Sequence, residues 1–167
     1  MEALGRLFDI STGAVPVDLS TAAVTGKRVH LKNCGGVSIV VFKGAGTAGD
    51  DPVFDLQEHS ASTGGTSQDL DVLTHYYVKQ EATLDGDETW SKVTQSTASE
   101  VTGNATSAEE QAIYVFEVGA NQLSDGFEWI SLNVADVGTN AQLGGVLYLL
   151  HDLAVQRTPE NLVNPLA

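Results

Sequence analysis

Apolar residues in this chain occur in short runs separated by turn residues, and no run has the length and period of an amphipathic helix. The run Val53–His59 alternates with period two, as a half-buried strand does, whereas Val37–Lys43 is almost continuously apolar, as a strand covered on both faces is. The runs predict eight or nine strands, at Leu4–Ile10, Arg28–Lys32, Val37–Lys43, Val53–His59, His75–Leu84, Thr89–Gln95, Ile113–Val118, Phe127–Val134 and Leu143–His151. This pattern favours an all-β protein, a β-sandwich or jelly roll of about eight strands, over a fold of alternating strands and helices.

Between the strands, Ser67–Leu73 is expected to form a short helix or an irregular loop, and Asn121–Gly126 one helical turn. The predicted core is Val37, Ile39, Val41, Val115, Phe127, Leu132, Val146 and Leu149. The run that begins at Phe127 is apolar on both faces, because Phe127 and Trp129 share one face and Ile130, Leu132 and Val134 share the other. We therefore expect a neighbouring subunit to contact Phe127 and Trp129.

Both ends of the chain are predicted to be arms on a single domain. Residues 1–155 form that domain, with an extended N-terminal arm at about residues 11–26, where no period is sustained. Residues 156–167 form the C-terminal arm, whose two prolines exclude a helix and an inner strand. The arm carries three apolar residues, Leu162, Val163 and Leu166, which are expected to dock on the body of the protein, a neighbouring subunit or another partner.

The segment Gly44–Gly49 matches the G-x-G-x-x-G pattern of dinucleotide-binding folds, which needs a helix to begin inside the pattern. Here Asp50 and Asp51 follow, and the next segment has the alternation of a strand. Two carboxylates would repel a phosphate, so we expect a hairpin loop without a nucleotide and assign the chain no cofactor.

No motif for catalysis or metal binding stands out, and the sequence predicts a protein that is not an enzyme. The four histidines are not spaced as metal ligands, Asp85–Glu88 has the Asp-Gly signal of a hairpin turn, and Cys34 is expected to be a small buried hydrophobe. With 8 Lys and Arg against 22 Asp and Glu, the net charge of −14 excludes nucleic-acid binding through phosphates and disfavours membrane surfaces. The N-terminus lacks the apolar stretch of a signal peptide, which predicts synthesis and assembly in a cytoplasm.

Several long segments resemble, over most of the chain, small structural proteins of tailed bacteriophages. The segments are Thr25–Asn33, Phe42–Pro52, Thr89–Gln95, Thr106–Gln111 and Val134–Gly144. The resemblance implies a virion component on the capsid surface, assembled in the host cytoplasm, with head decoration (cement) as the expected role. The implied partners are the major capsid protein and further copies of this chain, with a trimer favoured over a dimer, and no catalytic residues come with the family.

Two other functions stay open at this point. One is a tail-associated or minor capsid protein. The other is a carbohydrate-binding β-sandwich module that would use exposed aromatic residues, with Trp90, Trp129, Tyr76, Tyr77 and Tyr114 as the candidates. A sugar-binding platform needs its rings exposed and coplanar, whereas a structural subunit buries them in its core or its interfaces.

Overall fold

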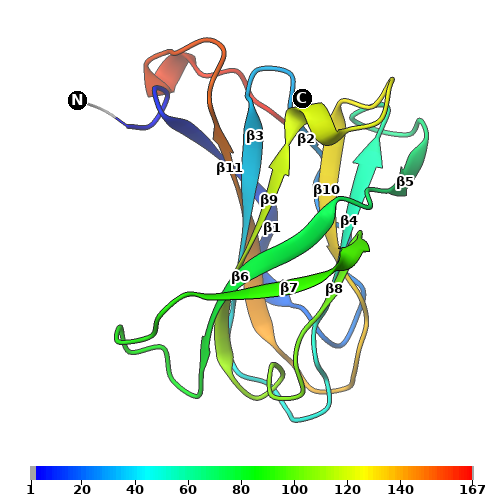
Figure 1. Cartoon of the computed structure of the whole chain (residues 1–167), viewed down its shortest axis with the longest axis vertical. Coiled ribbons are helices and arrows are strands. Elements are labelled where there is room, and N and C mark those ends of the chain that lie inside the picture. The colour runs from blue at the N-terminus through cyan, green and yellow to red at the C-terminus, as the bar shows by residue number, and fades with distance from the viewer. Residues whose placement is uncertain (1–2, 167) are drawn as a thin grey trace.

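Two antiparallel sheets pack face to face in the computed structural model, which describes residues 3–166 (Figure 1). The six-stranded sheet has the spatial order β1 (Phe8–Asp18), β11 (Leu143–His151), β3 (Gly36–Lys43), β9 (Gln111–Gly119), β6 (Leu73–Glu81), β7 (Ser91–Ala98). The second sheet has the order β2 (Val29–His30), β10 (Trp129–Val134), β4 (Val53–His59), β5 (Ser67–Asp69), and β8 (Glu100–Thr102) also pairs with β4. The predicted all-β sandwich is confirmed.

Most predicted strands are present, and β4 and β11 have the predicted bounds. The strand β5 replaces the helix or irregular loop expected at Ser67–Leu73, and β8 was not expected. Both are three residues long and mostly polar, so neither produces a recognisable alternation. Two 3-10 turns complete the described secondary structure, η1 (Ala120–Gln122), which falls where a helical turn was expected, and η2 (Pro159–Asn161).

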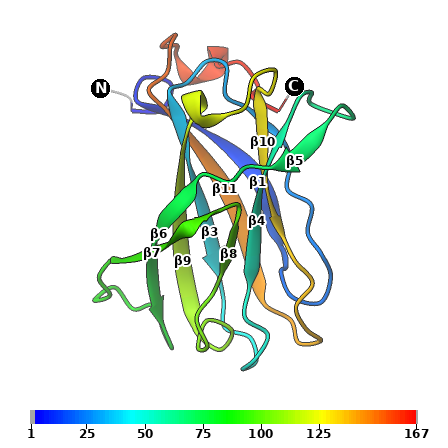
Figure 2. The same cartoon turned by 45° about the vertical axis from the view of Figure 1, so that its right-hand side comes forward.

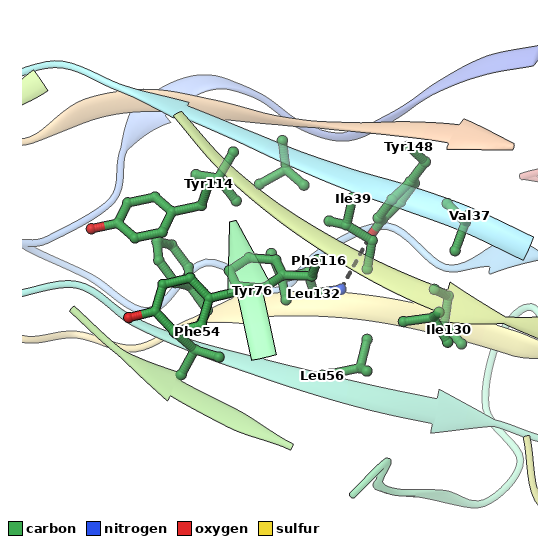
Figure 3. Packing of buried hydrophobic residues seen from close by; sticks show 14 of the residues in the cluster. Val37, Ile39, Phe54, Leu56, Tyr76, Tyr114, Phe116, Ile130, Leu132 and Tyr148 are labelled. Carbon is green, nitrogen blue, oxygen red and sulfur yellow. Dashed lines mark hydrogen bonds between the residues drawn. The ribbon is translucent and has the colours of Figure 1, made fainter. Parts of the chain in front are cut away.

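The core lies between the two sheets, and Figure 3 shows its centre. Aromatic rings from both sheets meet there: the ring of Phe54 lies 5.1 Å from that of Tyr114 and 5.5 Å from that of Phe116. Five of the eight predicted core residues are buried, namely Val37, Ile39, Val41, Leu132 and Val146. The prediction was wrong for Val115, Phe127 and Leu149, which are only half-buried.

The predicted N-terminal arm is not an arm, because its first half is part of the sandwich. Residues 11–18 belong to β1, which pairs with β11 along the edge of the six-stranded sheet. The register shifts twice between Thr12 and Val17, and these irregularities break the alternation that would have marked a strand. The rest of the segment packs on the body, since Leu19 is fully buried and Val24 forms a bridge with Val134.

The C-terminal segment docks on the body of its own chain. The backbone N–H of Arg157 donates to the carbonyl oxygen of Gly5 at 2.9 Å, and the N–H of His30 donates to that of Pro165 at 2.8 Å. Leu166 packs against the core. Residue 167 of the predicted arm lies outside the described residues. The segments near the two termini therefore lie at the same end of the sandwich, as Figures 1 and 2 show.

Candidate interaction surface

The outer face of the six-stranded sheet is apolar, although an outer sheet face that meets water is normally polar. Side chains alternate along each strand, so the neighbours of the buried core residues point away from the core. In β3, for example, Ile39 and Val41 are buried, while Val40 and Phe42 point outward. We use the name apolar outer face for the outward residues Ile10, Val40, Phe42, Tyr77, Ile113, Val115, Leu143, Leu147 and Leu149.

Strand register brings these residues together in rows. One row runs Leu147, Val40, Val115, Tyr77 across four neighbouring strands, because each of these residues is the Cα partner of the next. The side chains at the β1 and β3 side of this face are strongly exposed: the exposed fraction is 66% for Leu143, 59% for Phe42 and 47% for Ile10. A contiguous exposed patch of this kind marks an interaction site more often than a surface that stays in water.

A groove of about 480 Å³ crosses the same face. Its sides include Pro16 from β1 and Phe42 from β3, and Gly144 and Gly145 of β11 lie between them. Gly145 points outward and has no side chain to fill the space between the neighbouring strands, which is the physical origin of the hollow, whereas Gly144 faces the core beside Leu19. The groove gives the apolar outer face a shape into which a protruding apolar side chain fits.

The charges on this face nearly cancel, in contrast to the net charge of −14 of the whole chain. The outward positions of the named strands carry three acids, Asp18, Glu81 and Glu117, and two bases, Lys79 and Lys92. Lys79 Nζ lies 5.3 Å from the ring centroid of Trp90, and Lys92 Nζ lies 5.9 Å from that of Tyr77. Most of the remaining acids lie elsewhere on the surface, while Glu58 is fully buried.

The structure places the predicted contact residues of β10 within the chain itself. Trp129 is only 7% exposed because the ring of His30 stacks on it, with ring centroids 4.3 Å apart and an interplanar angle of 9°. Phe127 precedes β10 and is half-buried. His30 of β2 thus covers Trp129 within the chain, and the contact of Phe127 and Trp129 with a neighbouring subunit stays a prediction.

The three apolar residues of the C-terminal segment have different surroundings. Leu166 packs against the core and Leu162 is half-buried, while Val163 is 58% exposed. Val163 and Leu162 border a small cavity of about 100 Å³ that also reaches Cys34. Of the predicted contact residues, Val163 is the one whose side chain is left mainly in solvent.

The glycine-rich segment connects β3 to β4, which belong to different sheets. It is therefore a crossover between the sheets and not the predicted hairpin loop. The other two expectations are confirmed: the strand β4 follows the segment, and no helix begins inside it. The loop is tied to its surroundings, since the N–H of Gly46 donates to the carbonyl oxygen of Ala108 at 2.7 Å and the Gln142 side chain donates to that of Asp50 at 2.6 Å.

A buried lysine holds the beginning of this crossover. Lys43 is 1% exposed, and its ammonium group donates to the backbone carbonyl oxygens of Gly44 at 3.0 Å, Ala108 at 3.5 Å and Glu110 at 2.6 Å. Burial disfavours the charged form and lowers the pKa of Lys43 to about 8, although nearby Glu110 opposes this shift. The role visible in these contacts is to bind the carbonyl groups of two loops.

Because the pKa of Lys43 is low in the folded protein, we expect the free energy of unfolding to rise with pH just above neutrality. Between pH 8 and 9 the folded protein loses the Lys43 proton while the unfolded chain keeps it, so the free energy of unfolding should rise by about 1 kcal/mol. Urea titrations of a Cys34→Ala protein and of the same protein with Lys43→Met measure this, and only the first should show the rise. The Cys34→Ala background is needed because burial raises the pKa of the Cys34 thiol to about 11, which has the opposite effect above pH 9. If the free energy of unfolding changes equally with pH in the two proteins, the prediction is contradicted.

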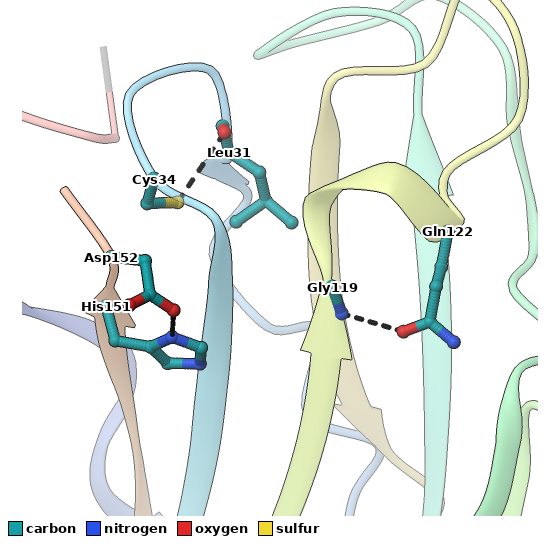
Figure 4. A network of polar contacts seen from close by, with 6 residues as sticks. All are labelled: Leu31, Cys34, Gly119, Gln122, His151 and Asp152. Atoms are coloured by element: carbon teal, nitrogen blue, oxygen red, sulfur yellow. Dashed lines mark hydrogen bonds and ion pairs between the residues drawn. The ribbon is translucent and has the colours of Figure 1, made fainter. Parts of the chain in front are cut away.

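Cys34 is a buried structural residue, as the sequence predicted (Figure 4). Its thiol donates to the carbonyl oxygen of Leu31 at 3.5 Å. Nearby strand ends are closed by polar contacts: His151 Nδ1 lies 2.8 Å from a carboxylate oxygen of Asp152, and the N–H of Gly119 donates to Gln122 Oε1 at 2.7 Å. The last two contacts stabilise turns at the strand ends. The Cys34 thiol itself is buried, so it is not exposed as a reactive group.

One histidine lies between two serine hydroxyls, which invites comparison with a nucleophile and its base. His59 Nδ1 is 2.8 Å from Ser67 Oγ and His59 Nε2 is 2.9 Å from Ser131 Oγ. Both ring nitrogens are thus engaged by hydroxyls, so no carboxylate orients the ring as in a catalytic triad. Burial, with Arg28 nearby, lowers the pKa of His59 to about 4, which makes the group a neutral link between β4, β5 and β10.

An acidic group also forms at the connection between β6 and β7, where oxygens of Glu81, Asp87 and Glu88 lie within 4.8 Å of one another. Asp87 belongs to the segment Asp85–Glu88 in the connection between these paired strands, as the hairpin prediction required. Glu81 and Asp87 are exposed, and nothing else at this connection indicates a ligand.

The aromatic residues proposed for sugar binding do not form one platform. Trp129, Tyr76 and Tyr114 are buried, and Trp90 and Tyr77 each lie beneath a lysine on the β6–β7 side of the six-stranded sheet. An extended row of coplanar exposed rings is therefore not available from these residues.

Comparisons with protein-family models, with curated protein sequences and with solved structures found no match for this chain. None of the helices in residues 3–166 is long and apolar enough to cross a membrane.

Proposed function

We propose that this chain is a non-enzymatic structural protein of a tailed-bacteriophage virion, and that it decorates the capsid as a cement protein. The apolar outer face is the observation that carries this proposal. A surface of Leu, Val, Ile and Phe side chains with few and nearly balanced charges is suited to stable protein contact and offers little to a small polar substrate.

The architecture supports the same function. The four-strand order β1, β11, β3, β9 faces the order β2, β10, β4, β8, and the chain changes sheet between successive strands of these eight except from β4 to β8; the hairpin β6–β7 extends one edge. We propose that this arrangement is a jelly roll, an architecture that occurs in viral capsid domains. Fold alone does not determine function, so the apolar outer face and the resemblance of the sequence segments remain the main support.

The end of the sandwich near the two termini is the proposed contact with the major capsid protein. The most exposed large apolar side chains of the terminal segments are Leu7 at 62%, Val163 at 58% and Val155 at 52%. The adjoining backbone is held by the contact between Gly5 and Arg157. Many such subunits on one shell would add their weak contacts and reinforce junctions between capsid subunits.

Co-sedimentation with capsid shells tests this function. Shells assembled from the major capsid protein of the encoding virus, without this chain, are mixed with the full-length protein and with a variant lacking residues 158–167. The full-length protein should bind saturably, and the truncated one at least about tenfold more weakly because it lacks the docked segment. Absence of saturable binding to shells would refute head decoration, and saturable binding to isolated tails instead would favour a tail-associated role.

A further inference from the structure

The apolar outer face lacks a cover within the described chain, and its composition limits what can cover it. The sequence run Val37–Lys43 is that of a strand buried on both faces, yet only the core side of β3 is covered by the other sheet. In sheet packing the missing cover is a second sheet about 10 Å away.

The charge distribution identifies the partner. Lys79 is paired in register with Ile113 of β9, and Glu117 follows Ile113 by four residues on the same strand. The two charges are therefore separated by about 13 Å along the strand direction. The row Leu147, Val40, Val115, Tyr77 lies midway between them, because Val115 is the residue halfway from Ile113 to Glu117.

We propose that a second copy of this chain covers the apolar outer face, in a two-fold pair whose axis crosses the strands along this row. Rotation about that axis lays β9 of one copy over β9 of the other and exchanges the two ends of the strand. Glu117 of each copy then faces the Ile113 level of the other, displaced sideways from Lys79 by one strand spacing of about 4.8 Å, which these long side chains can span. Two opposite-charge contacts form around an apolar centre, and each copy supplies one member of both. At the edge of the face Lys92, the register partner of Tyr77, lies opposite Lys92 of the other copy, so that one like-charge pair opposes the two opposite-charge contacts.

The overall charge of the chain favours this surface over others for self-contact. Two copies with a net charge of −14 each repel one another wherever their acidic surfaces meet. The apolar outer face is a region where the charges of each copy nearly cancel, so it is a region where two copies can approach closely. The inference rests on the proposed function and deepens it by naming the partner of the apolar outer face. The terminal segments, and not this face, make the proposed contact with the capsid. A two-fold pair, and not the trimer favoured from the sequence, follows because the face is complementary to itself.

Sedimentation velocity and equilibrium measurements on the purified full-length protein test the pair directly. The wild-type chain should form a dimer. Leu147→Asp, which places a carboxylate in the middle of the central row, should weaken dimerisation by about 100-fold or more. Val163→Asp adds the same charge at an exposed apolar position on the C-terminal segment and should leave dimerisation unchanged.

Charge exchange tests the proposed orientation. Lys79→Glu and Glu117→Lys should each weaken dimerisation by about tenfold, and the double variant should restore it to within about threefold of wild type. Glu117→Lys is the decisive variant, because it lowers the net negative charge and would strengthen association if only overall repulsion mattered. A monomeric wild-type protein, or a dimer that Leu147→Asp leaves intact, would overturn the proposal. If the wild-type chain dimerises but the double variant dimerises as weakly as the single variants, the proposed position of the two-fold axis is overturned. Thermal melting of each variant confirms that the subunit is folded.

The two proposals fail separately. If the protein dimerises as described but does not bind shells, decoration is refuted while the pair stands. If it binds shells as a monomer, and Val163→Asp weakens that binding while Leu147→Asp does not, the pair is refuted while decoration stands.

Discussion

Replacing Tyr148 by Phe should lower the free energy of unfolding by about 2–4 kcal/mol, although it removes a single oxygen atom. The hydroxyl of Tyr148, on β11 of the six-stranded sheet, crosses the core to the other sheet. It donates to the carbonyl oxygen of Lys27 at 2.9 Å. It also accepts from the N–H of Leu132 in β10 at 3.0 Å, the contact that Figure 3 shows. Tyr148 and Leu132 are both fully buried, so water does not replace the lost partner.

The large expected effect comes from the two backbone groups that are left without a partner. The short β2 pairs with β10 only at Trp129 and Ile130, so the N–H of Leu132 has no further backbone partner on that side. Urea unfolding of Tyr148→Phe against wild type measures the loss. Tyr76→Phe is the matched control, because Tyr76 is 6% exposed and its hydroxyl makes no hydrogen bond within residues 3–166. A loss for Tyr148→Phe no larger than for the control would show that the two backbone groups do not need this hydroxyl.

Elements with a regular period were predictable from sequence, and irregular ones were not. The alternation of Val53–His59 identifies β4 with its bounds. The strand β1 contains Pro16 and two register shifts, so its alternation is broken and the segment looks like an arm. Trp129 shows a different limit. The sequence indicates that β10 has two apolar faces, but the cover of the second face comes from His30, about a hundred residues away along the chain.

The candidate interaction surface was only partly predictable, because strand register creates it. The apolar runs Val37–Lys43 and Leu143–His151 indicate strands that bury both faces, and this signal pointed to the surface. That β11 and β3 lie side by side, with Leu147 opposite Val40, depends on the crossovers between sheets and could not be seen in the sequence. The sequence interpretation assigned the subunit contact to β10, whereas the face on which we propose that contact is formed by β3, β11 and their neighbours.

Acid should destabilise this protein by about 2–3 kcal/mol through one histidine as the pH falls from 7 to 4. His59 is 5% exposed, and burial lowers its pKa to about 4, whereas the same side chain in the unfolded protein has a pKa near 6.5. Between these two values the unfolded chain binds a proton that the folded chain does not bind. The free energy of unfolding therefore rises with pH across this window, and the stability contributed by neutral His59 is lost as the pH falls.

The structure around His59 explains why the proton is excluded. Both ring nitrogens lie close to serine hydroxyls, and the guanidinium group of Arg28 nearby adds an unfavourable charge. Urea unfolding of wild type and His59→Gln at several pH values from 7 to 4 measures the effect, and the difference in stability between the two proteins should shift by about 2–3 kcal/mol in favour of the variant at pH 4. His151→Gln serves as the control, since its side chain is 39% exposed, and subtracting its effect isolates the contribution of burial. A stability difference between wild type and His59→Gln that does not change with pH would mean that the folded protein accepts the proton at His59 as readily as the unfolded chain does.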